Sequence, residues 1–289
     1  MELLEYLESS RTALLAAAGL LGLCVGSFIN VVVHRLPLMM QAQWRAECAE
    51  LAGEPLPEAE KLNLMTPPSR CPSCQAPIEP WRNIPVVSWL LLRGRCANCA
   101  APIGVRYPAV ELLAGALSVL VAWRLGYSAA TLGALGFTWA LIALTFIDLD
   151  TQLLPDDITL PLLWAGLLAN AFGAIVDLRS AVIGAAAGYL LLWSVYWAFR
   201  LAAGKEGMGY GDFKLLAAIG AWAGWQVLPV VVIVSATLGA VIGSAALALS
   251  RRGMDARIPF GPYLAVGGLV GLLWGHDLVV AWLGHFPVW

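Results

Sequence analysis

Charged residues are scarce in this chain. Asp, Glu, Lys and Arg make up 12% of its 289 residues, whereas hydrophobic residues make up 60% and the mean hydropathy is +0.77. A soluble globular domain carries about 25% charged residues, so this composition excludes that class. The chain is therefore predicted to be a polytopic membrane protein.

Apolar runs of spanning length recur along the chain. They cover residues 12–33, 109–125, 129–147, 158–176, 181–199, 213–249 and 261–283. The run 213–249 is too long for one span, and the Gly and Pro residues at 224–229 offer a turn that divides it. We therefore expect an all-α fold with about eight transmembrane helices. Acidic residues, not basic ones, precede the first run, so we do not expect a cleavable signal peptide.

Basic residues are distributed unevenly between the expected loops. If the N-terminus lies outside, 14 of the 17 Lys and Arg residues fall on the inner side and 3 on the outer side. Positively charged loops stay in the cytosol, so this bias predicts the orientation. It places the loops that follow residue 147 and precede residue 213 on the cytosolic side.

The first inner loop is long and polar enough to form a small domain. We divide the chain into residues 1–34 with the first span, a cytosolic domain at 35–108, and a membrane domain at 109–289. Within the loop, we expect a short helix and an acidic linker at 41–63.

Four cysteines follow in two Cys-x2-Cys pairs with 21 residues (75–95) between them. The pairs are Cys71 with Cys74 and Cys96 with Cys99. Such a pattern is typical of a four-thiolate site for a structural zinc ion, which suits a segment too small for a large core. Two disulfides are the alternative, which a cytosolic location disfavours.

Two aspartates stand at the predicted inner ends of apolar runs. Asp148 directly follows one run and Asp212 directly precedes another. Acids at the edge of a bilayer are costly and commonly functional. The segment 213–224 would make only about 18 Å of helix against a core of roughly 30 Å, which brings Asp212 towards membrane depth. We therefore predict an aspartyl dyad that shares one proton, with one carboxylate acting as base towards water.

Several residues around the dyad have simpler interpretations. Asp156 or Asp157 can cap the helix that starts there, and Asp212 can cap its own helix. Lys214 is a candidate ion partner for Asp212. Gly209 and Gly211 permit close approach of the backbone ahead of Asp212.

Taken together, these motifs resemble the type IV prepilin peptidases, which are bifunctional leader peptidases and N-methyltransferases. The resemblance covers nearly the whole chain. Its motifs are Gly26-Ser27-Phe28-Ile29-Asn30 with Arg35-Leu36-Pro37, Arg70-Cys71-Pro72-Ser73-Cys74, Trp81-Arg82-Asn83-Ile84-Pro85, Arg93-Gly94-Arg95-Cys96, Arg106-Tyr107-Pro108, Leu154-Pro155-Asp156 after Asp148, and Gly209-Tyr210-Gly211-Asp212.

This resemblance implies a function and a location. It implies that Asp148 and Asp212 are catalytic, with Gly209, Gly211 and Asp156 in support. The enzyme would remove the leader of type IV prepilins and type II secretion pseudopilins at the cytosolic face of the bacterial inner membrane. It would then methylate the new N-terminus with S-adenosylmethionine.

Residues for the methylation step are harder to find in the sequence. The resemblance links Gly94 to methyl transfer, but Gly94 can equally shape the turn before Cys96. A Rossmann-type glycine fingerprint is lacking. Asn30 and Glu111, at the ends of apolar runs, can line a pocket or only satisfy helix ends.

Other functions fit less well. A peptidase without methylation is the nearest alternative. A metal-dependent membrane phosphotransferase would need phosphate-binding cations, which the Asp148 loop lacks. A proton-coupled transporter would need acids in mid-span, which the spans lack. The lipid bilayer and the prepilin substrates are the expected partners, and no nucleic-acid partner is expected.

Overall fold

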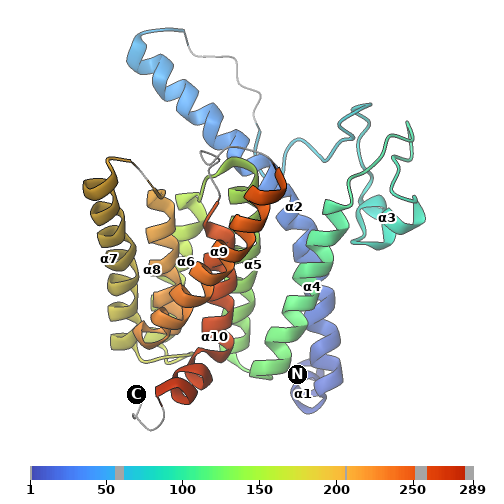
Figure 1. The fold of residues 1–289 in the computed structure, drawn as a ribbon. Helices are drawn as coiled ribbons and strands as arrows, with labels where there is room; N and C mark the ends of the chain where they lie inside the picture. Colours follow the sequence, from blue (N-terminus) through green and yellow to red (C-terminus); the bar gives the residue numbers. More distant parts are fainter. Residues whose placement is uncertain (1, 56–61, 206, 251–258, 284–289) are drawn as a thin grey trace. The chain divides into compact units, whose positions relative to one another are not determined.

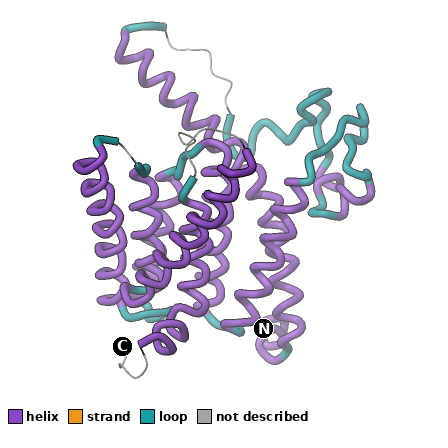
Figure 2. Tube along the Cα trace, in the orientation of Figure 1, coloured by secondary structure: helices purple, strands orange, loops and turns teal. Residues whose placement is uncertain are grey.

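A computed structural model describes residues 2–55, 62–205, 207–250 and 259–283. Within these residues the regular structure is helical apart from two isolated β-bridges, as Figure 2 shows. The chain forms two compact units, Met1–Gly126 and Tyr127–Trp289, which are treated separately below. The helices in chain order, labelled in Figure 1 where there is room, are α1 (Glu2–Ser9), α2 (Arg11–Ala52), η1 (Pro80–Asn83), α3 (Val87–Leu91), α4 (Arg106–Leu125), α5 (Ala129–Thr151), α6 (Asp156–Ala171), α7 (Leu178–Ala203), α8 (Tyr210–Ala223), η2 (Trp225–Val227), α9 (Leu228–Ser250) and α10 (Gly261–Leu283).

The prediction of an all-α membrane protein is confirmed at this level. Among the described residues, six helical segments are long and apolar enough to cross a bilayer: Arg11–Ala52, Arg106–Leu125, Ala129–Thr151, Leu178–Ala203, Trp225–Ala245 and Gly261–Ala281. Helices α6 and α8 occupy the other two predicted positions but have only 16 and 14 residues. A full span needs about 20 residues, so these two helices do not satisfy the length criterion.

Helix α2 corrects the prediction for the first loop. A helix is present at the start of the expected 41–63 segment, but it is the end of α2, which runs for 42 residues to Ala52 and passes through Pro37; residues 56–61 of the expected acidic linker lie outside the described residues. One proline removes a single helical hydrogen bond, and the surrounding turns keep their own bonds. The helix ends at Gly53, whose φ of 69° takes the left-handed conformation typical of a C-terminal cap. The buried Arg35 then donates to the carbonyls of Asn63 at 2.9 Å and Pro67 at 2.7 Å, which ties the following segment to α2.

In unit 1, α2 packs closely along α4. A Cβ added at Gly22 would lie 2.6 Å from the Ala114 carbonyl oxygen, and one at Gly26 would lie 2.7 Å from Glu111 Cα. Small residues that allow two backbones to touch are typical of helix pairs in membranes. Arg11 at the start of α2 donates to the Trp123 carbonyl at the end of α4, so the two helices are antiparallel.

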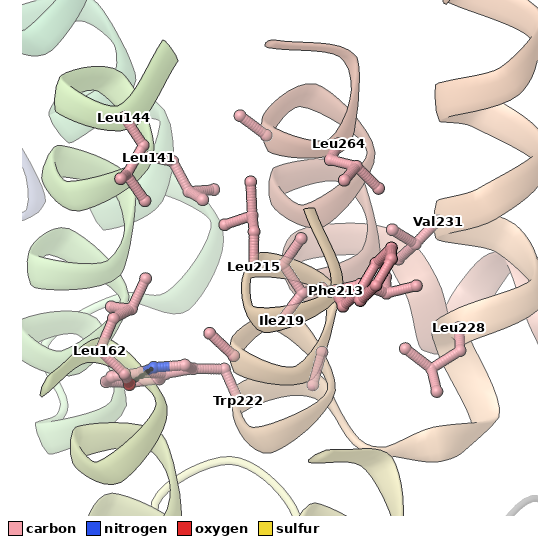
Figure 3. Close-up of a cluster of buried hydrophobic side chains, with 14 of the residues drawn as sticks. Leu141, Leu144, Leu162, Phe213, Leu215, Ile219, Trp222, Leu228, Val231 and Leu264 are labelled. Atoms are coloured by element: carbon pink, nitrogen blue, oxygen red, sulfur yellow. Dashed lines mark hydrogen bonds between the residues drawn. The ribbon is translucent and has the colours of Figure 1, made fainter. Parts of the chain in front are cut away.

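In unit 2, α8 lies in the middle of a helix bundle. It packs against α6, α7 and α10, and 11 of its 14 residues are buried. Figure 3 shows Phe213, Leu215 and Ile219 of α8 among Leu141, Leu144, Leu162, Val231 and Leu264 from neighbouring helices. A helix that is apolar on every side is stable only when it is surrounded, which explains why this short segment shows little amphipathic pattern.

Two close contacts fix the position of α8. The backbones of α7 and α8 meet at Gly184 and Gly220, where an added Cβ at Gly184 would lie 2.3 Å from the Gly220 carbonyl oxygen. At the C-terminal end of α8, the buried Asn170 amide donates to the carbonyls of Ala221 at 2.9 Å and Trp222 at 3.2 Å. The two Asn170 bonds satisfy carbonyls in the last turn of a helix that ends inside the bundle.

Candidate functional site

Asp148 is a buried acid near the C-terminal end of α5. Its side chain is 5% exposed, and its Oδ2 accepts a hydrogen bond of 2.9 Å from the backbone N–H of Gly261. The C-terminal end of a helix is unfavourable for an anion, whereas the N-terminal end favours one. Gly261 begins α10, so the first turn of a second helix supplies the donor that α5 lacks.

Asp212 is a buried acid in the first turn of α8, with 7% of its surface exposed. Gly209 is the N-cap of this helix, and its carbonyl accepts a hydrogen bond of 3.3 Å from the Asp212 backbone N–H. Asp212 therefore lies in the first turn, where the N-terminal end of a helix favours an anion, and its capping role stays a prediction. Gly211 allows close packing, since an added Cβ there would lie 2.7 Å from Leu154 Cβ.

The two aspartates come together at one end of unit 2. Asp148 Oδ2 lies against Gly261 at the start of α10, and Gly211 directly precedes Asp212 at the start of α8. Leu154 contacts both sides of this region, because added Cβ atoms at Gly211 and Gly261 would both meet its side chain. Among the described residues of unit 2, these two are the buried acids. Two buried carboxylates on separate helices can share a proton and polarise a substrate, which is the arrangement that acid–base hydrolysis needs.

The neighbours of the dyad differ from the sequence interpretations in two ways. Asp156 and Asp157 do not cap α6, because Pro155 is the N-cap and makes no side-chain cap bond. Lys214 does not pair with Asp212 but binds both carboxylate oxygens of Asp156 at 2.7 Å. Asp156 therefore links the start of α6 to the first turns of α8.

In unit 1, the four cysteines of the two pairs form a single cluster. All four Sγ atoms lie within 4.8 Å of one another, with Cys71 and Cys99 at 3.9 Å and Cys74 and Cys96 at 4.0 Å. A tetrahedral ion with metal–sulfur bonds of about 2.3 Å needs sulfur atoms roughly 3.8 Å apart. The cluster therefore has the geometry of a metal site, and its four cysteines are free thiols in this structure, not the two disulfides of the alternative.

Hydrogen bonds favour the thiolate form that a metal needs at two of the four cysteines, Cys74 and Cys96. The pKa of Cys99 is raised to about 11, because the Ala101 backbone lowers it by less than Cys74, burial and the other cysteines together raise it. The Asn98 amide at 3.5 Å from Cys74 Sγ, followed by the Ala76 backbone, lowers the pKa of Cys74 to about 6. The backbone N–H groups of Cys99 and then Asn98 lower the pKa of Cys96. Donors aimed at sulfur are typical of metal-binding cysteine turns.

A repeat in the sequence produces the two cysteine turns. Residues 70–78 read RCPSCQAPI and residues 95–103 read RCANCAAPI. Each copy closes with one β-bridge, Arg70 with Pro77 and Arg95 with Pro102, and each places the residue after its second cysteine at positive φ. The spacing of the cysteines predicted the cluster, whereas this nine-residue repeat is a further signal in the sequence that was not used to predict it.

Gly94 shapes the turn that leads into the second copy. Its φ is 66°, and an added Cβ would lie 2.9 Å from the Trp89 ring. Its N–H donates to the Trp89 carbonyl at 2.8 Å, and its carbonyl accepts from Ile103 at 2.7 Å. This geometry agrees with the turn-shaping interpretation, and a direct role in methyl transfer stays a prediction.

Glu111 is a further buried acid, in α4 of unit 1. Its Oε2 accepts a 2.7 Å hydrogen bond from the backbone N–H of Val86. Val86 has a φ of 60°, which is strained for a β-branched residue. Glu111 thus stabilises the strained backbone of Val86, which directly precedes α3. Because α3 leads into the turn at Gly94, Glu111 also supports that turn.

A helical membrane bundle with two buried aspartates at one end of unit 2 has the features of an intramembrane aspartyl hydrolase. The comparisons with known proteins identify the family. The model described as "Bacterial Peptidase A24 N-terminal domain" matches residues 20–125, and the model described as "Type IV leader peptidase family" matches residues 135–244. The chain therefore belongs to the type IV leader peptidase family, which confirms the resemblance found in its motifs.

Curated relatives match nearly end to end. A prepilin leader peptidase/N-methyltransferase of Pseudomonas aeruginosa is 52% identical over 98% of this chain and 98% of its own length. Proteins of the same name are 52% identical in Stutzerimonas stutzeri, over 96% of this chain and 97% of its own length, and 55% identical in Aeromonas salmonicida, over 91% of each chain. No solved structure matches the chain.

Proposed function

We propose that this protein is a prepilin leader peptidase and N-methyltransferase that cleaves with an aspartyl dyad of Asp148 and Asp212. The observation that carries the proposal is the pair of buried carboxylates on α5 and α8 in a chain 52% identical to a curated enzyme of that name. The substrates are type IV prepilins and type II secretion pseudopilins.

The dyad performs hydrolysis without a covalent intermediate. The ionised carboxylate removes a proton from water, whose oxygen attacks the carbonyl carbon of the scissile bond. The protonated carboxylate polarises the carbonyl oxygen and then protonates the departing amine as the C–N bond breaks. The Gly261 backbone donor holds the Asp148 carboxylate during this cycle, and the first turn of α8 positions Asp212.

Topology favours cleavage at the inner membrane boundary. The Lys and Arg bias puts the N-terminus outside and the dyad on the cytosolic side of the bacterial inner membrane, with eight helices crossing or entering the bilayer. A prepilin has its leader in the cytosol and its next residues in an apolar helix. Its scissile bond would then reach the depth at which Asp148 and Asp212 lie.

The second reaction joins a methyl group to the new N-terminus. The free amine attacks the methyl carbon of S-adenosylmethionine, an N–C bond forms, the C–S bond breaks and a proton is released. We assign this reaction to the segment 35–108, where Cys71, Cys74, Cys96 and Cys99 would hold a structural zinc ion. Gly94 would then act by shaping the fold beside this site.

The test is a two-step assay with the purified full-length protein in detergent. A prepilin with its leader is incubated first, and S-adenosylmethionine is added afterwards. We expect cleavage after the glycine at the leader boundary, and then a mass increase of one methyl group at the new N-terminus. Cleavage that survives EDTA agrees with the dyad, whereas cleavage lost with EDTA and restored by Mg²⁺ would favour metal-dependent chemistry. Cleavage without methylation would support the peptidase-only alternative.

A further inference from the structure

The start of α10 touches one of the two aspartates. Gly261 and Asp148 are 113 residues apart in sequence, and their hydrogen bond of 2.9 Å is buried. The first N–H groups of a helix have no partner within the helix and carry partial positive charge. Gly261 therefore provides a directed donor to one oxygen of the Asp148 carboxylate. Helix α10 also packs against α5, the helix that carries Asp148.

The space at Gly261 admits no side chain. An added Cβ would lie 2.6 Å from Asp148 Oδ2 and 3.1 Å from Leu154 Cδ2. Both distances are shorter than an ordinary van der Waals contact, and the closer one involves the carboxylate itself. A methyl group here would push the carboxylate away from the donor that orients it.

Leu154 extends this contact to the second aspartate. Its Cβ would lie 2.7 Å from a Cβ added at Gly211, the residue directly before Asp212. One side chain therefore packs between the start of α10 and the start of α8. The spacing of the two helix starts, and of the carboxylates beside them, depends on glycine at both places.

We propose that Gly261 is a positioning residue for cleavage, acting through Asp148. Its backbone N–H fixes the carboxylate, and its missing side chain lets α10 approach closely enough to do so. This inference rests on the proposed function, because it assumes that Asp148 is catalytic. It adds a residue whose role comes from its backbone alone.

The main test compares Gly261→Ala with Gly268→Ala, a control on the same helix. A Cβ at Gly268 would lie 2.7 Å from Ile219 Cδ1, which is about as close as the 2.6 Å between a Cβ at Gly261 and Asp148 Oδ2. The control therefore introduces a similar steric contact on α10 without touching Asp148. We expect Gly261→Ala to lower kcat for prepilin cleavage about 100-fold, with KM changed less than about 3-fold. The control should keep kcat within about 3-fold of wild type.

Two further readouts separate positioning from misfolding. Methyl transfer to a pre-cleaved peptide should be unchanged in Gly261→Ala, because it reports an activity assigned to the other compact unit. A backbone ester at position 261, made with glycolic acid in place of glycine, removes the N–H without adding atoms that clash. We expect this ester to lower kcat about 10-fold, as for the loss of one hydrogen bond to a charged group.

The outcomes distinguish this inference from the proposed function. Wild-type kcat in the ester, or an equal loss in Gly268→Ala, would overturn the positioning role. Asp148→Asn is assayed in parallel, and if it cleaves normally the dyad itself is wrong. If Asp148→Asn is inactive while Gly261→Ala cleaves like wild type, the dyad stands and only the role of Gly261 fails.

Discussion

The crossing of α7 and α8 should be the most sensitive packing contact in unit 2. A Cβ at Gly184 would lie 2.3 Å from the Gly220 carbonyl oxygen, against at least 3.4 Å for an ordinary contact. The obstacle is backbone, so no side-chain rotation can relieve it, and Gly184→Ala must move the helices apart by about 1 Å. Overpacking of this kind costs about 1–3 kcal/mol.

The assay is thermal unfolding in detergent together with prepilin cleavage. A loss of about 1–3 kcal/mol should lower Tm by roughly 3–10 °C in a unit of this size. Cleavage should fall as well, because α8 carries Asp212. The matched control is Gly136→Ala in α5, where an added Cβ meets nothing within 4 Å. It should be neutral or slightly stabilising, since alanine favours a helix by up to about 1 kcal/mol over glycine.

The result that refutes this reasoning is specific. If Gly184→Ala unfolds within about 1 °C of wild type while Gly136→Ala does the same, the two backbones are not in contact. The centre of unit 2 would then need a different packing, and the placement of Asp212 would lose its support.

Two further predictions concern unit 1. Cys74→Ser should reduce bound zinc in the purified protein from one ion per chain to well below half, measured by elemental analysis, with Cys48→Ser as a control outside the cluster; full zinc in Cys74→Ser would contradict the site. Glu111→Ala leaves the Val86 N–H without its acceptor, and an unsatisfied buried donor costs about 1–3 kcal/mol of local stability. We expect methylation of a pre-cleaved peptide to fall about tenfold or more as a result. Cleavage by Glu111→Ala should stay within about 2-fold of wild type, and equal loss of both activities would indicate general destabilisation instead.

The membrane class and the position of most helices could be predicted from hydropathy. Asp148 and Asp212 stood out because acids beside apolar runs are costly. The cysteine cluster followed from spacing, since thiolates at Cys-x2-Cys intervals converge on one ion. These features depend on local composition, which the sequence displays directly.

Contacts made by backbone atoms could not be predicted in the same way. Gly261 donates through its N–H, and nothing in its side chain signals a partner 113 residues away. Lys214 was assigned to the wrong acid, because sequence distance favoured Asp212 whereas folding brings Asp156 against it. The continuation of α2 through Pro37 was not predicted, because proline usually ends a helix. In the structure the regular turns on both sides outweigh the cost of one lost hydrogen bond.

The central claim is that Asp148 and Asp212 together perform the cleavage. The most direct measurement is kcat for prepilin cleavage by Asp148→Asn and Asp212→Asn, beside Asp150→Asn as an exposed acid on the same helix, with methylation of pre-cleaved peptide followed in parallel. The account predicts that the first two variants lose cleavage but still methylate, and that Asp150→Asn retains both activities. Cleavage near the wild-type rate by either Asp148→Asn or Asp212→Asn would contradict it.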